Sequence, residues 1–262
     1  MEQHNNHSLD KINSVEKALM VLMVFCEKQP FWGVRELSAR LDFNPSTIQR
    51  ILQTLKAYGF IRQDPGTRKY SLGNIYLSFF RSLQNTYPIT QLAMPYMKQL
   101  LSRTQETVHL NVIDTDGLSR ICISSLESPQ ELKASQAIGT KAPLYAGATS
   151  KGLLAFSSQK FIDRYLEQVK LSQLTKNTIT NVKELLSELA LIRERGYASS
   201  LGETSQGLGA LSVPLFTFSG GKALLAGISL AIPEVRFNNY DHRKLCIEEL
   251  LLVAKEFSVI TE

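Results

Sequence analysis

Residues 33–72 constrain this chain most, because they hold two short amphipathic segments, a tight turn between them and a basic hairpin pattern after them. In the first segment Val34, Leu37 and Leu41 recur at helical spacing, with charged residues on the other face. The second segment carries apolar residues at positions 48, 51, 52 and 55, which predict the inward face of another helix. Two short helices joined in this way predict a helix-turn-helix.

The ends of the second helix are marked by residues with strong positional preferences. Asn44 suits the position that caps a helix, and Pro45 suits the first helical position, where a missing N–H costs nothing. Gly59 predicts the left-handed residue that ends the helix. The outward side chains are mostly polar, which is typical of a helix that enters the major groove of DNA. The residues here that we expect to contact DNA are Asn44, Ser46, Thr47, Gln49, Arg50 and Gln53.

A two-stranded hairpin is predicted directly after this helix. Residues 60–62 and 69–72 form its strands, and Pro65 with Gly66 forms its turn. The basic residues around its tip, as a wing that contacts DNA requires, are Arg62, Arg68 and Lys69. Each feature alone is also typical of ordinary packing or of a solvated charged face. Their occurrence together and in this order favours a winged helix that binds DNA. A ligand-binding or protein-interaction module whose winged helix contacts protein instead is the alternative.

The length of 262 residues predicts two hydrophobic cores rather than one. The net charge is +5, with ten Lys and Arg against seven Asp and Glu in residues 1–72 and nineteen against seventeen in the rest. Because this basic excess is modest, affinity for nucleic acid must depend on where the cations lie and on a dimer that presents two copies.

Cysteine usage and the amino-terminal sequence indicate a cytoplasmic protein. Cys26, Cys122 and Cys246 lie far apart in apolar stretches, which predicts reduced, buried thiols. No apolar run has the length needed to span a membrane, and the polar start has no signal-peptide core. Residues 1–13 are predicted to be a disordered tail, and contact of this tail with DNA is left open.

Helical patterns lie on both sides of the helix-turn-helix and its wing. Ser14 is predicted to cap a first helix, so that the DNA-binding domain spans residues 14–72. Residues 73–87 are predicted to form a linker helix that also serves dimerisation. The apolar stripe expected on the first helix is Val15, Ala18, Leu19, Leu22 and Phe25.

Residues 88–262 alternate between strand and helix patterns. Strands are predicted at 108–112, 118–124, 211–218 and 224–232, with turns at 114–117 and 219–221. Helices are predicted at 89–103, 150–157, 161–169 and 240–258, together with one that Asn181 and Glu184 cap reciprocally and Gly196 ends. The inward residues expected in the 89–103 helix are Leu92, Tyr96, Leu100 and Leu101. These patterns predict an α+β domain with an antiparallel sheet flanked by helices.

Nearly the whole chain resembles the IclR-type transcriptional regulators. The stretches that carry the resemblance are SVEKALMVLMVF, RELSARLDFNPSTIQRILQTL and GFIRQDPGTRKYSLG in the first domain, and ETVHLNVID, PLYAGATSKGLLA, IRERGYA, QGLGALSVPLF and GISLAIP in the second. The resemblance implies a winged helix, a linker helix and a GAF-like α/β effector-binding domain, assembled as homodimers or dimers of dimers. It also implies two partners, double-stranded DNA with a palindromic operator and a small-molecule effector, and no cofactor.

The resemblance implies a ligand pocket in the second domain, formed by Leu144, Gly147, Ala148, Thr149, Ser200, Ala210, Ser229 and Ala231. The alternative is that these small residues simply let strands pack closely. Tyr145, Ser150 and Ser200 replace the family's usual His, Gly and Asp, while Glu203 is retained. Ala210 stands where a cysteine can occur. We therefore expect an uncharged pocket, with hydroxyls and with the free N–H groups of a helix that begins near Ser150. Such groups suit a small carboxylate or a hydroxylated or aromatic acid.

The sequence contains no recognisable catalytic constellation. His109 and His242 are expected to be structural, and His4 and His7 provide no metal cage. Residues 147–152 and 220–222 lack the full pattern of a phosphate-binding loop, and no nucleophile elbow occurs. We therefore expect no enzymatic activity and no metal site, against the remaining interpretation of an enzyme fused to a helix-turn-helix.

Overall fold

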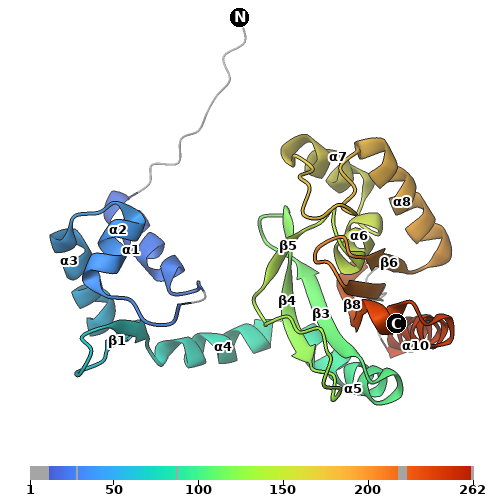
Figure 1. Cartoon of the computed structure of the whole chain (residues 1–262), viewed down its shortest axis with the longest axis horizontal. Coiled ribbons are helices and arrows are strands. Elements are labelled where there is room, and N and C mark those ends of the chain that lie inside the picture. Colours follow the sequence, from blue (N-terminus) through green and yellow to red (C-terminus); the bar gives the residue numbers. More distant parts are fainter. Residues whose placement is uncertain (1–11, 28, 87, 218–222, 261–262) are drawn as a thin grey trace, which may run out of the picture. The chain divides into compact units, whose positions relative to one another are not determined.

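The computed structural model describes residues 12–27, 29–86, 88–217 and 223–260, and it divides the chain into two compact units (Figure 1). The first unit is Met1–Thr86 and the second is Tyr87–Glu262. The helix assigned to the linker belongs to the first unit. The predicted disordered tail, residues 1–13, lies almost entirely outside the described residues, and the domain boundaries at 14 and 72 stay predictions.

The first unit is a three-helix domain with a hairpin and a trailing helix. In chain order its elements are α1 (Asn13–Val24), α2 (Val34–Leu41), α3 (Pro45–Ala57), β1 (Ile61–Gln63), β2 (Tyr70–Leu72) and α4 (Ile75–Thr86). The strands β1 and β2 pair antiparallel, with Ile61 opposite Leu72. Leu37, Ile48 and Leu52 are fully buried between the helices. This arrangement agrees with the predicted helix-turn-helix and wing.

Helix α1 differs from its prediction in both its cap and its buried face. Ile12, not Ser14, occupies the N-cap position, and Ser14 lies inside the helix. The buried residues are Val21, Val24 and Phe25, whereas Val15 and Leu19 are 51% and 56% exposed. Residues 18–26 are all apolar, so periodicity could not decide which face meets the core. The same ambiguity explains why Cys26, expected to be buried, is exposed.

Helix α4 is attached to the hairpin by an aromatic cluster. The ring of Phe60, directly before β1, lies 5.9 Å from the ring of Tyr76 and 5.9 Å from that of Phe79. Rings at such separations pack favourably. The opposite side of α4 remains uncovered, since Leu77 is 71% exposed.

The second unit is built on one six-stranded sheet in the order β5-β4-β3-β8-β7-β6, with every neighbouring pair antiparallel. Its strands are β3 (Thr107–Ile113), β4 (Ser119–Leu126), β5 (Lys141–Pro143), β6 (Ala198–Leu201), β7 (Leu208–Thr217) and β8 (Ala223–Pro233). Its helices are α5 (Pro88–Thr104), α6 (Ala148–Ala155), α7 (Gln159–Gln168), α8 (Val182–Arg195), α9 (Glu234–Phe237) and α10 (Tyr240–Ile260). The predicted α+β class with an antiparallel sheet is confirmed.

Helices cover both faces of this sheet. Helices α5 and α10 pack on one face, and α6, α7 and α8 gather at the other (Figure 1). Val108, Leu110 and Val112 of β3 belong to the core beneath α5 and α10. Because side chains alternate along a strand, His109 and Asn111 point to the face of α6. Both are buried, so polar side chains are enclosed on that second face.

Several local expectations were confirmed and others were wrong. The side chain of Asn181 accepts hydrogen bonds from the N–H groups of Lys183 and Glu184, and Gly196 ends α8 with φ of 80°. The reciprocal bond from the Glu184 side chain is not found among the described residues.

Leu92 is 45% exposed, because the buried stripe of α5 runs through Ile89, Ala93, Met97 and Leu100. Helix α6 begins at Ala148, two residues before the predicted start. The predicted turn at 219–221 lies outside the described residues.

Candidate functional site

Helix α3 presents a polar exposed side. Ser46, Arg50 and Gln53 are exposed and lie three or four residues apart, so they share one helical face. Thr47 and Gln49 flank this face and are half-buried. Asn44 occupies the N-cap position as predicted, but its side chain makes no capping hydrogen bond and is exposed. The structure thus brings together the six side chains that the sequence proposed for this helix.

The hairpin tip is held by its own hydrogen bonds. Asp64 Oδ1 accepts from the N–H and the hydroxyl of Thr67, at 2.7 and 2.8 Å, and these bonds lower the pKa of Asp64. Arg68 adopts a left-handed backbone conformation with φ of 59°. A shaped tip with a non-glycine residue in this conformation presents the Arg68 side chain in a defined direction.

The three cations of the hairpin have different partners. Lys69 forms an ion pair of 2.7 Å with Glu36 of α2, and this contact lowers the pKa of Glu36. Arg62 Nε donates to the hydroxyl of Ser71 at 3.2 Å. Neither Arg50 nor Arg68 has a carboxylate at ion-pair distance in the part of the chain that the structure describes. These two guanidinium groups are therefore available to an anionic partner.

The second unit contains a cavity of about 380 Å³ at the α6 face of the sheet. Such a volume falls within the range of small-molecule sites. Seven of the eight predicted pocket residues line it, namely Gly147, Ala148, Thr149, Ser200, Ala210, Ser229 and Ala231. Leu144 does not, because it is fully buried in the hydrophobic cluster beneath α6.

Strand register gathers this lining from four strands. His109 of β3 lies opposite Ser229 of β8, Ala231 of β8 opposite Ala210 of β7, and Ala210 opposite Ser200 of β6. Directly opposed residues share a face of the sheet. His109 therefore lines the cavity, and the expectation that it is merely structural was incomplete. The signal for it was the polar residue at every second position of the strand TVHLNVI, namely Thr107, His109 and Asn111.

The cavity is not uncharged, in contrast to the prediction. Arg120 and Lys141 line it, and its lining includes no Asp or Glu. Lys141 is paired with Asp114 at the rim, whereas the partners of Arg120 are neutral. Arg120 lies on β4 opposite Ile113, and its side chain lies on the cavity face because of that register. The sequence predicted that these two strands form a hairpin but not their residue register, so this contribution was missed.

The charge of Arg120 affects its neighbour. Burial, together with the positive charge of Arg120, lowers the pKa of His109 from 6.5 to about 4. His109 is therefore neutral near pH 7 and offers one donor and one acceptor nitrogen.

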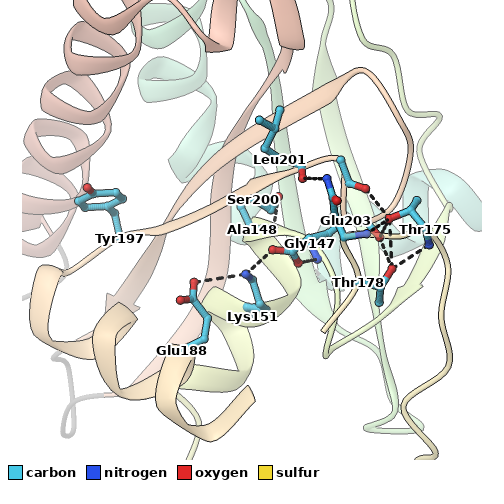
Figure 2. Close-up of polar contacts among 12 residues, drawn as sticks. Gly147, Ala148, Lys151, Thr175, Thr178, Glu188, Tyr197, Ser200, Leu201 and Glu203 are labelled. Carbon is cyan, nitrogen blue, oxygen red and sulfur yellow. Dashed lines mark hydrogen bonds and ion pairs between the residues drawn. The ribbon is translucent and has the colours of Figure 1, made fainter. Parts of the chain in front are cut away.

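A buried ion-pair network lies beside the cavity (Figure 2). Lys151 of α6 is 1% exposed and contacts Glu203 at 2.5 Å and Glu188 of α8 at 3.2 Å. Glu188 also pairs with Arg195 at 3.0 Å. Glu203, retained from the family pattern, is therefore engaged in this network and does not line the cavity.

Two N–H groups at the start of α6 already have acceptors within the chain. The N–H of Gly147 donates to Glu203 Oε2, and that of Ala148 donates to the Ser200 hydroxyl, each at 2.9 Å (Figure 2). The expectation of a helix start with free N–H groups was therefore wrong for its first two positions. Ser200 fills the role of an acceptor here, as an acidic side chain at this position also could.

Threonine side chains fix the segment that carries Glu203. Thr175 Oγ1 donates to the carbonyl of Gly202 at 2.5 Å, and Thr178 Oγ1 donates to the carbonyl of Glu203 at 2.7 Å (Figure 2). Gly202 has φ of 68°, a conformation that favours glycine. The segment 200–205, of which Ser200, Thr204 and Ser205 line the cavity, is thus tied to the loop before α8.

The remaining candidate reactive groups have structural partners. Glu106, 1% exposed, accepts from Arg236 at 2.6 Å and contacts His242 at 2.8 Å. Burial raises the pKa of the Cys122 thiol and raises that of Cys246 to about 12, so both are protonated near pH 7. Within the described ranges, no three His, Cys, Asp or Glu residues are grouped so as to hold a metal ion. In that same part of the chain no helix is both long and apolar enough to cross a membrane.

Comparisons with known proteins give a consistent result. A family model described as the bacterial transcriptional regulator IclR C-terminal domain matches residues 81–259, and one described as the IclR helix-turn-helix domain matches residues 14–65. The HTH-type transcriptional regulator KdgR of Escherichia coli (strain K12) is 34% identical over 230 residues, covering 87% of this chain and 85% of that protein.

Solved structures agree with these matches. An IclR transcriptional regulator from Alicyclobacillus acidocaldarius superposes with a TM-score of 0.81 at 26% identity, over 96% of this chain and 100% of that one. An IclR homolog from Microbacterium hydrocarbonoxydans, complexed with 4-hydroxybenzoate, superposes with a TM-score of 0.78 at 17% identity, over 94% and 98% of the two chains.

Proposed function

Since this chain belongs to the IclR family of DNA-binding transcriptional regulators, we propose that its DNA binding is controlled by a small organic acid held in the cavity of the second unit. The observation that carries this proposal is the cavity of about 380 Å³, whose lining includes cations and hydroxyls but no acid. The 4-hydroxybenzoate found in a relative of the same fold supports an organic acid as the class of effector. The protein then acts as a regulator without a catalytic step.

We assign base recognition to the exposed side of α3. In the major groove, Arg50 suits guanine and Gln49 suits adenine through paired hydrogen bonds, and Thr47 suits a base or a phosphate. Ser46 and Gln53 lie next to Arg50 on the exposed face. An Arg50 that turns to phosphate is the alternative, and it would bind DNA without reading the base.

We assign phosphate contacts to the hairpin. Arg68 is the principal cation, because Lys69 is already paired with Glu36 and Arg62 is bonded to Ser71. Phosphate contacts raise affinity for all sequences and make it depend on salt.

A homodimer is the form in which we expect the protein to bind DNA. Exposed apolar side chains on α1 and α4, among them Leu19, Met23 and Leu77, are the surfaces available for self-association. A dimer with two-fold symmetry reads a palindrome, with half-sites about one helical turn apart.

An effector controls such a dimer only by differential affinity. The acid must bind one arrangement of the protein more tightly than another, and the same free energy then changes the affinity for DNA. Residues 147–149 and 200–205 are candidates for the responding segments, because both contribute residues to the cavity lining and are joined by the hydrogen bonds of Ser200 and Glu203.

The proposal is tested by selecting bound fragments from a genomic library and measuring their affinity by fluorescence anisotropy. We expect the wild-type protein to select a palindromic site, and the double variant Arg50→Ala with Arg68→Ala to lose it. Unchanged binding by the double variant would show that the α3 face and the hairpin are not the DNA interface. Organic acids are then titrated into the wild-type complex, and a change in anisotropy identifies an effector.

A further inference from the structure

We propose that Arg120 is the anchor of the effector: the cavity takes a small hydroxylated carboxylate, whose carboxylate group pairs with the Arg120 guanidinium rather than with the start of α6. This inference rests on the proposed function, because it names the chemistry of that same cavity. It differs from the sequence-based expectation, which placed the acid at helix N–H groups.

Arg120 is a largely enclosed cation with no counter-ion. Its hydrogen-bond acceptors are Asn111 Oδ1 at 2.5 Å, Ser150 Oγ at 3.1 Å and Gln136 Oε1 at 3.3 Å, and all three are neutral. No carboxylate lies at ion-pair distance from it among the residues that the structure describes. A cation withdrawn from water is costly unless an anion compensates it. An anionic ligand would supply the missing compensation.

The Arg120 guanidinium also has N–H groups that are not used in these hydrogen bonds. Arginine carries five N–H groups, and the three bonds described use one each on Nε, Nη1 and Nη2. One N–H therefore remains on each of the two Nη atoms. The two oxygens of a carboxylate match a pair of such donors.

An independent observation indicates that a ligand is missing from the polar set. His109 is only 4% exposed, and its Nε2 atom is buried without a hydrogen-bond partner. The Nδ2 atom of Asn111, which holds Arg120, is likewise buried and without a partner. Buried polar atoms are almost always satisfied in folded proteins. Because His109 lines the cavity beside the unpaired Arg120 cation, its unsatisfied Nε2 atom points to a polar occupant of the cavity.

Two other possible anchors, the Lys141 ammonium and the N–H groups of Gly147 and Ala148, are already occupied. The ammonium of Lys141 pairs with Asp114, and its side chain is 54% exposed at the rim. The N–H groups of Gly147 and Ala148 are bonded to Glu203 and Ser200. An incoming carboxylate at either place would have to displace a carboxylate or a hydroxyl of the protein. Arg120 needs no such displacement.

The rest of the lining indicates the body of the ligand. The hydroxyl-bearing side chains around the cavity are Ser135, Thr140, Thr149, Ser200, Thr204, Ser205 and Ser229. The lining includes no Phe, Tyr or Trp on which an aromatic ring could stack. A hydroxylated aliphatic acid therefore fits the wall better than an aromatic acid does.

The test uses acids and their uncharged amides as matched probes. Lactate, gluconate and 4-hydroxybenzoate are titrated calorimetrically into the full-length protein, alongside lactamide, gluconamide and 4-hydroxybenzamide. We expect a hydroxylated aliphatic acid to bind and its amide to bind at least about tenfold more weakly, because a hydrogen-bonded charge is lost. Arg120→Met should weaken binding of the acid by at least about tenfold, and it should remove the preference for the acid over its amide.

Lys141→Met is the matched control, since it removes a cation of the same wall that is already paired with Asp114. We expect it to leave the preference for the acid in place. The proposal is overturned if Arg120→Met binds the acid as tightly as the wild type, if Lys141→Met shows the larger loss, or if no acid of the panel binds the wild-type protein. Tighter binding of 4-hydroxybenzoate than of either aliphatic acid overturns the hydroxylated aliphatic class.

A second measurement covers the case in which Arg120→Met does not fold. Burial, and after it the charge of Arg120, lowers the pKa of His109. A carboxylate beside Arg120 offsets the second of these causes, so the His109 ring should titrate at a higher pH in the complex. This is followed by NMR on the wild-type protein with and without acid. An acid that binds without moving the His109 titration contradicts the anchor. An acid that binds at Arg120 but leaves DNA affinity unchanged contradicts the proposed function and leaves the anchor standing.

Discussion

Arg68 in the first unit and Arg120 in the second carry the same guanidinium group in opposite surroundings. Arg68 lies at the tip of the hairpin and is exposed. Arg120 lies in the wall of a cavity and is bonded to three neutral side chains. An exposed cation attracts any phosphate and is screened by salt, whereas an enclosed one selects a ligand of matching charge and shape. The comparison separates affinity for DNA from recognition of the effector.

The largest expected effect comes from a buried ion pair of the second unit, compared with an exposed ion pair of the same unit. Lys151 is 1% exposed and pairs with Glu203, so Lys151→Met leaves a buried carboxylate without a cation. We expect the free energy of unfolding of the second unit to fall by about 3–5 kcal/mol. Urea denaturation followed by far-ultraviolet circular dichroism measures it, while fluorescence of Trp32, the single tryptophan, reports the first unit.

The control for that prediction is Lys133→Met, which removes an exposed pair with Glu127. Such pairs contribute about 0–1 kcal/mol. Equal losses of unfolding free energy in the two variants would mean that burial does not change how much an ion pair stabilises this protein.

A second effect is a pH dependence of stability that arises from His109, which is buried beside Arg120 at the cavity. The pKa of His109 is about 4 in the folded protein and 6.5 for the model group, so the unfolded chain binds a proton first as the pH falls. Stability should therefore be present above pH 6.5 and decline toward pH 4, with His109 contributing about 3 kcal/mol in total. Denaturation of the wild type and His109→Gln across this range isolates the contribution. Parallel pH profiles for the two proteins would show that His109 is not enclosed as described.

A third effect concerns the exposed face of α3. Arg50→Ala should weaken specific DNA binding by about 1–3 kcal/mol and relax discrimination at one base position. Anisotropy titrations with single-base variants of the site measure both quantities. Arg40→Ala, which removes an exposed cation of α2 that pairs with Glu27, serves as the control. If Arg50→Ala weakens binding to all DNA sequences equally, Arg50 contacts phosphate and its assignment to base recognition is wrong.

The smallest effect distinguishes cations within the hairpin. Arg68→Ala should weaken binding to specific and random DNA alike. It should also reduce by about one the slope of log affinity against log salt concentration. Lys69→Ala should change the slope less, because Glu36 already offsets its charge. Binding measured over a series of salt concentrations decides between them. A larger change for Lys69 would mean that its ion pair opens on DNA.

Much of the fold was predictable because local chemistry agreed with tertiary structure. Asn181, Gly196 and Gly59 mark helix ends whatever surrounds them, since their preferences are local. The inward face of α1 was not predictable, because this helix is apolar on several sides and its sequence pattern does not select one face for burial. The core of the first unit selects Val21 and Val24, and nothing local to α1 indicates that choice.

The cavity was predictable in position but not in charge. Seven lining residues followed from the family resemblance, and all are small. Arg120 and His109 were missed as contributors, because strand register places each on the cavity face: Arg120 pairs with Ile113 across a short turn, and His109 pairs with Ser229 of a distant strand. The short strands β5 and β6 were missed for a related reason, since strands of three and four residues are defined by their partners more than by their composition.

The central claim is that the exposed cations set DNA affinity while Arg120 sets the response to the effector. The direct test is an anisotropy titration of the selected DNA site with wild type, Arg68→Ala and Arg120→Met, each with and without saturating gluconate or whichever acid of the panel binds. We predict that Arg68→Ala binds DNA more weakly but keeps the wild-type fold-change on adding acid. Arg120→Met should bind DNA as the wild type does and lose that fold-change. A variant at Arg120 that still responds fully, or one at Arg68 that abolishes the response, would contradict the account.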